Sequence, residues 1–319
     1  MEPELAWEVE SLLLRIFEYG DYSFRAALRG DYSETLDCTF VLARYEGILI
    51  GAAGCLCSRW DCGIAIVGPV GVHPEYRRQG IGTRMLGSLL EYLKGRGCTA
   101  AYLGLSAANP AVHLYRKIGF ENHSGIVMRL PLNSAQDSDG IDCQRDRRPS
   151  IRRACWGDSP GVSALISYAG SMYTYDLQRG LFSSKYVPPT RFLSVFPDMM
   201  KAFARHGGLA NVLLTERPQR VAGMAQIRRL ASAAQQHVAE LDFFVHDSFL
   251  EYTTSLVEQT LRDYPVSSTD RINAYCLRCD RTKQHVLEVV GGRRIALLPD
   301  RAIINGRHVD VLVYDLRNT

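Results

Sequence analysis

The chain has 319 residues, and at roughly 100–200 residues per domain this length predicts two domains that each bury a core. It is 46% hydrophobic and 22% charged, which is ordinary for a globular protein and excludes disordered, collagen-like and coiled-coil classes. The 37 basic and 34 acidic residues leave a net charge of +3, too balanced to indicate a nucleic acid or a membrane as partner. No apolar run reaches the ~18 residues of a membrane span.

The first residues and the cysteines indicate in which cellular compartment the protein is expected. The first four residues lack the basic start and apolar run of a secretory signal. The nine cysteines are scattered and odd in number, which is typical of reduced thiols rather than a disulfide framework. We therefore expect a cytoplasmic protein, either a monomer or a homodimer.

Residues 1–132 are expected to form a first domain of mixed α/β structure. In chain order we expect an apolar-faced helix from Leu5 to Ile16, a hairpin of Phe40–Ala43 and Ile48–Ile50, a strand at Ala65–Val72, a helix from Ile81 to Leu93, a strand at Ala100–Leu105, a helix at Ala111–Ile118 and a strand at Ile126–Leu130. Residues 133–149 are polar and charged and are expected to be a linker.

Residues 150–319 repeat this order of elements. We expect a strand at Ile151–Ala154, a helix carrying Val162 to Ile166, a hairpin of Asn211–Thr215 and Val221–Ile227, a strand at Leu241–Val245, a helix at Phe249–Leu261, a strand at Ile272–Leu277, a helix through Val286–Val290 and a strand at Val309–Tyr314. The chain is thus predicted to hold two copies of one fold. The strand that opens the second copy has no evident counterpart ahead of the first.

One stretch of the first copy carries chemistry. A strand ends at Val72 and a helix begins near Gly82, with Arg77-x-x-Gly80-x-Gly82 between them. Glycines let a backbone turn tightly and approach a ligand closely. The free N–H groups and the dipole of the helix start favour an anion such as a pyrophosphate.

Two other phosphate-binding motifs can be tested against this stretch. A P-loop needs Lys-Ser or Lys-Thr after its second glycine, whereas Thr83-Arg84 follows here. A dinucleotide fold needs a third glycine and an acidic residue about 20 positions later, and neither is present. No cysteine or histidine pattern predicts a metal site, because the pair Cys276 and Cys279 has no partner pair.

A second motif, Leu114-Tyr-Arg-Lys-Ile-Gly-Phe120, follows at a specific separation. Together the two motifs resemble the GCN5-related N-acetyltransferase (GNAT) family over about Thr39 to Leu130. The opening of the second half, Ile151-Arg-Arg-Ala154, also looks like the first strand of that family. The whole chain therefore resembles a tandem acetyltransferase: two GNAT-like domains, each a mixed, mostly antiparallel sheet flanked by helices, with a splayed parallel strand pair.

The resemblance implies a site for acetyl-CoA between Ala65–Val72 and Ala100–Leu105. Main-chain groups of Val70 and Val72 would hold its pantetheine arm, and Tyr115 would protonate the departing thiolate as general acid. The family asparagine sits one residue earlier, at Ala108, so Asn109 either contacts the cofactor or caps a helix. The pyrophosphate would be bound around the turn, at Arg77, Arg78, Gln79, Gly80, Ile81, Gly82 and Thr83.

The acceptor implied is the primary amine of a small molecule, attacking the thioester directly. An amine of pKa about 10.4 is neutral in about 1 in 2,500 molecules at pH 7, so its deprotonation is the larger problem. Three side chains are candidate bases, namely Asp61, His73 and Glu75. Alternatives are acetylation of protein lysines or N-termini, and a non-catalytic acyl-CoA-binding scaffold.

The second copy is expected to bind no CoA. After Val245 its sequence is His-Asp-Ser-Phe-Leu-Glu-Tyr-Thr, with no glycine between Gly223 and Gly291 and a connection about two residues shorter. Asp247 and Glu251 would put negative charge where a diphosphate binds. This half would stabilise the chain or wall the acceptor cleft, where Asp242 or Asp247 would favour a cationic acceptor.

Overall fold

The computed structural model describes most of the chain. Its described residues are 3–17, 25–60, 63–105, 108–132, 148–176, 180–181, 195–216, 219–230, 235, 237–265 and 271–316. They divide into two compact units. The first draws on Met1–Asp142 and Cys155–Ala164, and the second on Cys143–Ala154, Leu165–Arg191 and Val195–Thr319.

The described strands of the first unit form one six-stranded sheet in the order β1-β2-β3-β4-β6-β5. Neighbours are antiparallel except β3 and β4, which are parallel. The strands are β1 (Leu36–Tyr45), β2 (Ile48–Ser58), β3 (Ile64–Val72), β4 (Ala100–Gly104), β5 (Glu121–Ser124) and β6 (Val127–Pro131). The helices are α1 (Pro3–Phe17), α2 (Arg25–Leu28), α3 (Ile81–Gly95) and α4 (Val112–Ile118), with a short 3-10 turn η1 (Pro74–Tyr76).

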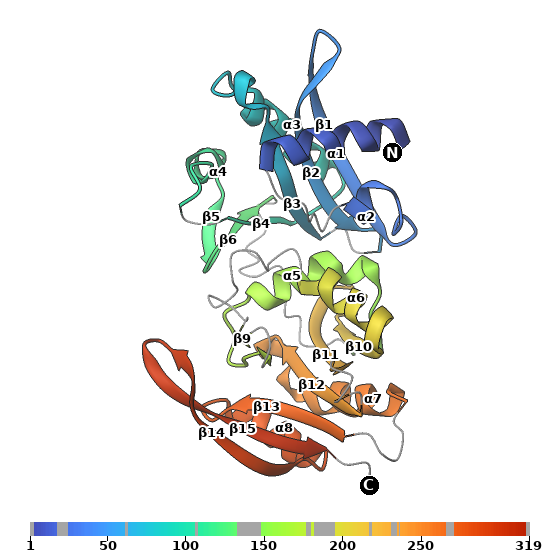
Figure 1. Cartoon of the computed structure of the whole chain (residues 1–319), viewed down its shortest axis with the longest axis vertical. Coiled ribbons are helices and arrows are strands. Elements are labelled where there is room, and N and C mark those ends of the chain that lie inside the picture. Colours follow the sequence, from blue (N-terminus) through green and yellow to red (C-terminus); the bar gives the residue numbers. More distant parts are fainter. Residues whose placement is uncertain are drawn as a thin grey trace. The chain divides into compact units, whose positions relative to one another are not determined.

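Helices α1 and α3 cover opposite faces of this sheet (Figure 1). The apolar face of α1 packs on Leu49 and Ala52 of β2, whereas α3 packs on Ile50 and Ala53 of the same strand. Successive side chains of a strand point to opposite faces, so one strand serves two cores. All six apolar residues that predict the face of α3 are buried, from Ile81 to Leu93.

The described strands of the second unit form a seven-stranded sheet in the order β14-β15-β13-β12-β11-β10-β7, with a separate small pair β8-β9. Only β12 and β13 are parallel among these neighbours. The large-sheet strands are β7 (Ser150–Arg153), β10 (Gly208–Leu214), β11 (Val221–Arg229), β12 (Val238–Val245), β13 (Arg271–Leu277), β14 (Arg293–Ile304) and β15 (Arg307–Leu316). The remaining elements of the second unit are α6 (Val195–His206), α7 (Thr253–Asp263), α8 (Arg281–Val289), β8 (Tyr175–Asp176), β9 (Gly180–Leu181) and the 3-10 turn η5 (Asp247–Tyr252). The 3-10 turn η2 (Trp156–Asp158) belongs to the first unit, and α5 (Ser159–Ser167) spans the boundary between the two.

The two sheets share one strand order. From β10 to β14 the second sheet repeats β1 to β5 of the first, with a parallel pair at the same place and a helix, α3 or α7, between its strands. Strand β7 is the extra member, and the described part of the first unit holds no counterpart to it. This confirms the prediction of two mixed α/β sheets built on one plan.

Among the elements that were not expected from the sequence, three have a physical reason for being missed. Strand β5 is polar throughout, so no apolar alternation marks it. Strand β14 is an edge strand whose apolar residues are largely exposed and which is interrupted by Pro299 and two register shifts. Helix α6 carries Pro197 within its first turn, a position that tolerates proline but reads as a break in a sequence pattern.

The helix expected at Phe249–Leu261 begins later than predicted. The α-helix α7 begins at Thr253, and η5 precedes it with a non-helical kink at Phe249. The connection from β12 to α7 therefore has seven residues, 246–252, against eight in the first unit, 73–80. It is one residue shorter, not two.

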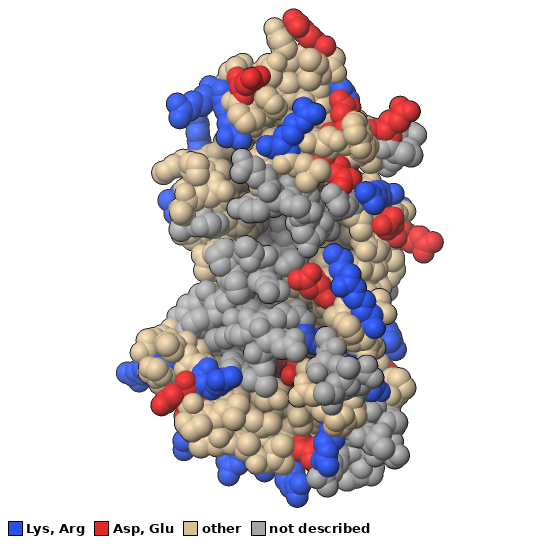
Figure 2. Space-filling view, viewed as in Figure 1, with Lys and Arg blue, Asp and Glu red and all other residues tan. Residues whose placement is uncertain are grey.

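The surface carries both signs of charge in each unit, as Figure 2 shows for one face. Within the described part of the chain, no helix combines the length and the apolar character needed to cross a bilayer.

Candidate functional site

The parallel strands β3 and β4 separate partway along their length. They pair from Ile64 opposite Ala100 to Ile66 opposite Tyr102, and no later residue of β3 pairs with β4. Strand β3 continues to Val72 along β2 alone, past a register shift at Gly54. The result is a gap between two strands of one sheet, as the resemblance predicted.

The edge of β3 that faces this gap presents main-chain groups. The amide of His73 donates to Ile50 of β2 at 2.8 Å. Hydrogen-bonded and non-bonded pairs alternate along an antiparallel ladder, so Gly71 also bonds toward β2, whereas Val70 and Val72 direct their N–H and C=O groups toward the gap. This orientation fits a contact with a pantetheine arm, and the roles of Val70 and Val72 stay predictions.

The turn after β3 aims a row of amides outward. Arg78 and Gly80 both adopt the left-handed conformation, with φ of 62° and 75°. Helix α3 begins at Ile81 with Gly80 as its N-cap. The amides of Arg78 to Thr83 donate to no acceptor among the described residues, while Arg84 makes the first bond of the helix, to Gly80 at 3.1 Å. Unpaired amides at a helix start form an anion site.

Gly80 and Gly82 have different structural roles in this turn. A Cβ at Gly80 would meet nothing within 4 Å, so glycine is needed there for its left-handed backbone. Gly82 is helical, and a Cβ there would lie 3.5 Å from Leu114 and 3.8 Å from Val72. Gly82 therefore presents no side chain at a place between the end of β3 and helix α4.

Tyr115 of α4 is buried against Phe120, with ring centroids 5.7 Å apart and nearly perpendicular. Burial raises the pKa of its hydroxyl to about 12, because a phenolate loses hydration in the apolar surroundings. Among the described residues the hydroxyl has no hydrogen-bond partner. Tyr115 therefore keeps its phenolic proton at physiological pH.

Asn109 has a structural partner. Its Oδ1 accepts a hydrogen bond from the amide of Ala111 at 2.9 Å, at the start of α4. The bond closes a turn just before α4, whose N-cap is Ala111 and has no side-chain cap bond, so it does not make Asn109 the helix cap, and the contact of Asn109 with a cofactor stays a prediction.

The candidate bases differ in their surroundings. Glu75 is 80% exposed and lies 3.9 Å from Nδ1 of His73. That nitrogen is buried without a hydrogen-bond partner among the described residues, and the ring stands edge-on to Tyr76. Asp61 lies outside the described residues, so this set yields no assigned base.

The second unit repeats the strand end but not the turn. His246 donates to Ala222 at 2.8 Å and Phe249 donates to His246, matching the bonds of His73 and Tyr76. Counted from this anchor, Leu250 and Glu251 stand where the first unit has Arg77 and Arg78. Within the described part of this turn no residue adopts a positive φ, and the chain runs directly from η5 into α7.

The strand gap of the second unit is occupied by its own side chains. Strands β12 and β13 pair only as far as Leu241 opposite Ala274. Beyond that point the ammonium of Lys283, a fully buried residue of α8, bonds the carboxylate of Asp242 and the carbonyl of Phe243. It also donates to the carbonyl of Tyr173 at 2.9 Å. Nothing in the sequence pattern pointed to this lysine.

These contacts correct one expectation. Asp242 was expected to favour a cationic acceptor, but its carboxylate is buried and already paired with Lys283. Asp247 accepts bonds from the amide and the hydroxyl of Ser171, at 3.0 and 2.7 Å. Asp242 is therefore part of the interior of the second unit, whereas Asp247 is exposed and bonded to Ser171.

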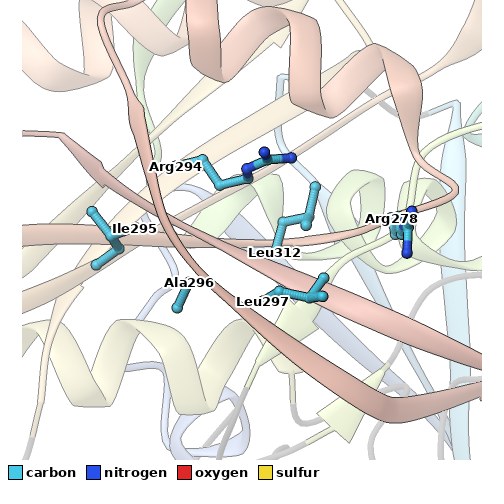
Figure 3. A pocket seen from close by; sticks show the side chains of 6 residues that line it. All are labelled: Arg278, Arg294, Ile295, Ala296, Leu297 and Leu312. Carbon is cyan, nitrogen blue, oxygen red and sulfur yellow. The ribbon is translucent and has the colours of Figure 1, made fainter.

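A separate pocket lies on the outer strands of the second unit (Figure 3). Its lining comes from β14, β15 and the residue after β13, namely Arg278, Arg294, Ile295, Ala296, Leu297 and Leu312. Arg278 is already paired with Asp310 at 2.9 Å. None of the site residues predicted from the sequence lines this pocket.

The first unit matches a known protein family. Residues 6–120 match the family model described as "Acetyltransferase (GNAT) family". Two curated relatives, the mouse and human "Cysteine-rich protein 2-binding protein", are each 43% identical over 56 residues. That match spans 18% of this chain and 7% of the length of either relative.

Solved structures were also compared. A GNAT superfamily phosphinothricin acetyltransferase from Sinorhizobium meliloti, in complex with AcCoA, is 14% identical, with a TM-score of 0.43 and coverage of 52% of this chain and 86% of that one. The putative acetyltransferase yncA from Salmonella typhimurium, with its cofactor acetyl-CoA, is also 14% identical, with a TM-score of 0.42 and coverage of 53% and 94%. Acetyl-CoA fits the matched family as co-substrate.

Proposed function

We propose that this chain, whose residues 6–120 belong to the acetyltransferase (GNAT) family, transfers an acetyl group from acetyl-CoA to the primary amine of a small molecule. The observation that carries the proposal is the row of unbonded amides from Arg78 to Thr83, at the mouth of the gap between β3 and β4.

The residues present fit acetyl-CoA in two respects. The diphosphate is an anion, and the amides at the start of α3 lack other acceptors in the described structure. The pantetheine arm carries amide groups, and the two main-chain groups of Val70 and the N–H of Val72 that face the gap complement them. Gly82 leaves the passage between these two parts open.

The chemistry assigned to the chain is modest. The neutral amine attacks the thioester carbonyl, the N–C bond forms, and the C–S bond breaks with its electron pair leaving on sulfur. Tyr115 donates a proton or a hydrogen bond to that sulfur. A free thiol has a pKa of about 8.5, well below that of Tyr115, but the same burial raises the pKa of a thiol. The proton lost by the amine passes to water or to a base outside those assigned.

The second unit is proposed to bind no acetyl-CoA. Its turn lacks glycine and left-handed residues, and Glu251 brings negative charge near the helix start. Its strand gap is filled by Lys283, and both main-chain groups of Phe243 that face the gap are already bonded. Its role is to complete and stabilise the chain.

Two other functions are kept as outcomes of the test. Acetylation of a protein lysine or N-terminus uses the same site and needs only a different acceptor. A scaffold that binds acyl-CoA without turnover would need the amides at the start of α3. It would not need a general acid, so the buried phenol of Tyr115 beside Phe120 would have no catalytic role.

The experiment is a thiol-release assay with purified full-length protein, acetyl-CoA and a panel of small amines, amino acids and lysine peptides. We expect turnover on at least one small amine, and loss of both binding and turnover in Gly82→Glu, because its carboxylate would enter the phosphate site. Activity on peptides alone would move the acceptor to proteins. Intact CoA binding by Gly82→Glu would show that the site is elsewhere.

A further inference from the structure

Arg77 makes one side-chain hydrogen bond in the described structure, and its acceptor is the last residue of β3. Its Nε donates to the carbonyl of Val72 at 3.1 Å. The bond closes a loop whose inner turn is held by Tyr76 donating to His73 at 2.9 Å. The exposed guanidinium forms no ion pair with a described carboxylate.

The loop that this bond closes leads directly into the residues whose amides are unbonded. Arg77 itself is extended, with φ −69° and ψ 163°, and the chain then reverses hand at Arg78 and again at Gly80. A left-handed arginine is disfavoured and persists only where its surroundings hold it. The Arg77 side chain ties the residue before this reversal to the end of β3.

Resting on the proposed function, we propose that Arg77 is a positioning residue for acetyl-CoA: its Nε–H holds the turn to Val72 so that the amides of residues 78–83 face the diphosphate. Its positive charge is not the reason it is needed. The carbonyl of Val72 is consequently occupied, and the gap offers a pantetheine arm the N–H of Val72 and both groups of Val70.

The second unit shows the same strand end without the tie. Leu250 stands at the place of Arg77, counted from the matching bonds of His246 and His73. A leucine cannot donate a hydrogen bond, and the turn there stays right-handed and passes straight into a helix. The first unit therefore has both the row of unbonded amides and a side-chain donor at residue 77. The described turn of the second unit has neither.

Two uncharged substitutions separate the donor from the charge. In Arg77→Gln the Nε2 stands as many bonds from Cα as the Nε of arginine, so the donor is kept and the charge is lost. Arg77→Met has similar length and neither donor nor charge. Arg78→Gln serves as the comparison for a charge near the diphosphate without such a bond. Calorimetric Kd values for CoA are measured at several salt concentrations, with KM for acetyl-CoA and for the amine.

We expect Arg77→Gln to bind CoA within about twofold of wild type, and Arg77→Met to bind about five- to tenfold more weakly at every salt concentration. The KM for the amine should stay unchanged in both. Equal weakening of both variants, shrinking as salt rises, would assign Arg77 to charge and overturn the proposal. Unchanged binding in Arg77→Met would overturn it as well.

Amide hydrogen exchange provides a readout that does not need CoA. In Arg77→Met the hydrogen-bonded amides around the turn, those of Tyr76, Arg77 and Arg84, should exchange faster, with the melting temperature held within a few degrees, and in Arg77→Gln they should not. If wild type binds no CoA, the proposed function fails, and this comparison alone decides whether Arg77 positions the turn.

Discussion

At the scale of single residues, the sharpest test concerns Tyr115. The residue is buried, its pKa is raised to about 12, and its hydroxyl has no partner among the described residues. We expect Tyr115→Phe to lower kcat by about 10²-fold or more while leaving KM for acetyl-CoA nearly unchanged, because the phenyl ring keeps the packing on Phe120. Steady-state kinetics with the best amine of the panel measures both constants.

The pH profile checks the same assignment. Burial favours the neutral phenol, so Tyr115 stays protonated up to a pKa of about 12. The rate should rise from pH 6 to 9.5 as the amine loses its proton, with no fall from loss of the acid. A fall near pH 8 that disappears in Tyr115→Phe would contradict a phenol with this pKa.

At the scale of elements, α3 was predicted almost completely, whereas the neighbouring weak elements were not. The face of α3 repeats at helical spacing and all six of its apolar residues are buried. The polar strand β5 and the exposed edge strand β14 bury too little on either face to leave such a pattern. The bond from Arg77 to Val72 and the pair of Lys283 with Asp242 depend on tertiary contacts, which spacing does not encode.

A substitution at Gly82 is predicted to raise the stability of the fold and to weaken the binding of acetyl-CoA. A Cβ there makes only ordinary contacts with Leu114 and Val72, and alanine is favoured over glycine in a helix by up to about 1 kcal/mol. We expect Gly82→Ala to unfold at a slightly higher temperature and to show a raised KM for acetyl-CoA. Thermal unfolding and steady-state kinetics measure the two effects.

Gly87 is the matched control for that variant, because it lies in the same helix and a Cβ there would meet nothing within 4 Å. Gly87→Ala should gain similar stability with KM unchanged. If both variants raise KM alike, the effect comes from the helix and not from the entrance to the gap.

The buried ion pair of α8 predicts a large stability effect. Removing the ammonium in Lys283→Met leaves Asp242 and Asp280 buried with less compensation, at a cost of about 3–5 kcal/mol. Adding Asp242→Leu should restore much of it, because a hydrophobic pair can replace a buried ion pair. Urea unfolding of the two variants and wild type gives the free energies of unfolding.

The pH dependence of this loss has a definite sign. Burial raises the pKa of Asp280, and Lys283 opposes that shift. Without the lysine the pKa of Asp280 rises further, so the folded variant takes up a proton more readily than its unfolded chain. The deficit of Lys283→Met should therefore be smaller at pH 5 than at pH 8, and an equal deficit at both would contradict the role given to Asp280.

At the scale of the whole molecule, the repeated pattern of elements predicts that both sheets share one strand order. The sequence predicts only in part that the two units differ where their parallel strands separate. The missing glycines after Val245 predict a lost phosphate cradle. The filling of the gap by Lys283 follows from a helix, α8, brought against strand β12 by the fold. Two sheets on one plan thus differ where their parallel strands separate, because a buried lysine bonds the edge of β12 in the second unit.

This asymmetry predicts one acetyl-CoA per chain. Calorimetric titration of the full-length protein should give a single site, because the second unit offers a bonded strand edge and a turn without outward amides. Gly82→Glu should remove that site entirely, whereas Lys283→Met, if folded at the chosen temperature, should keep it at similar affinity. Two sites in wild type, or a residual site in Gly82→Glu, would mean that the second unit binds the ligand by groups other than those of the first.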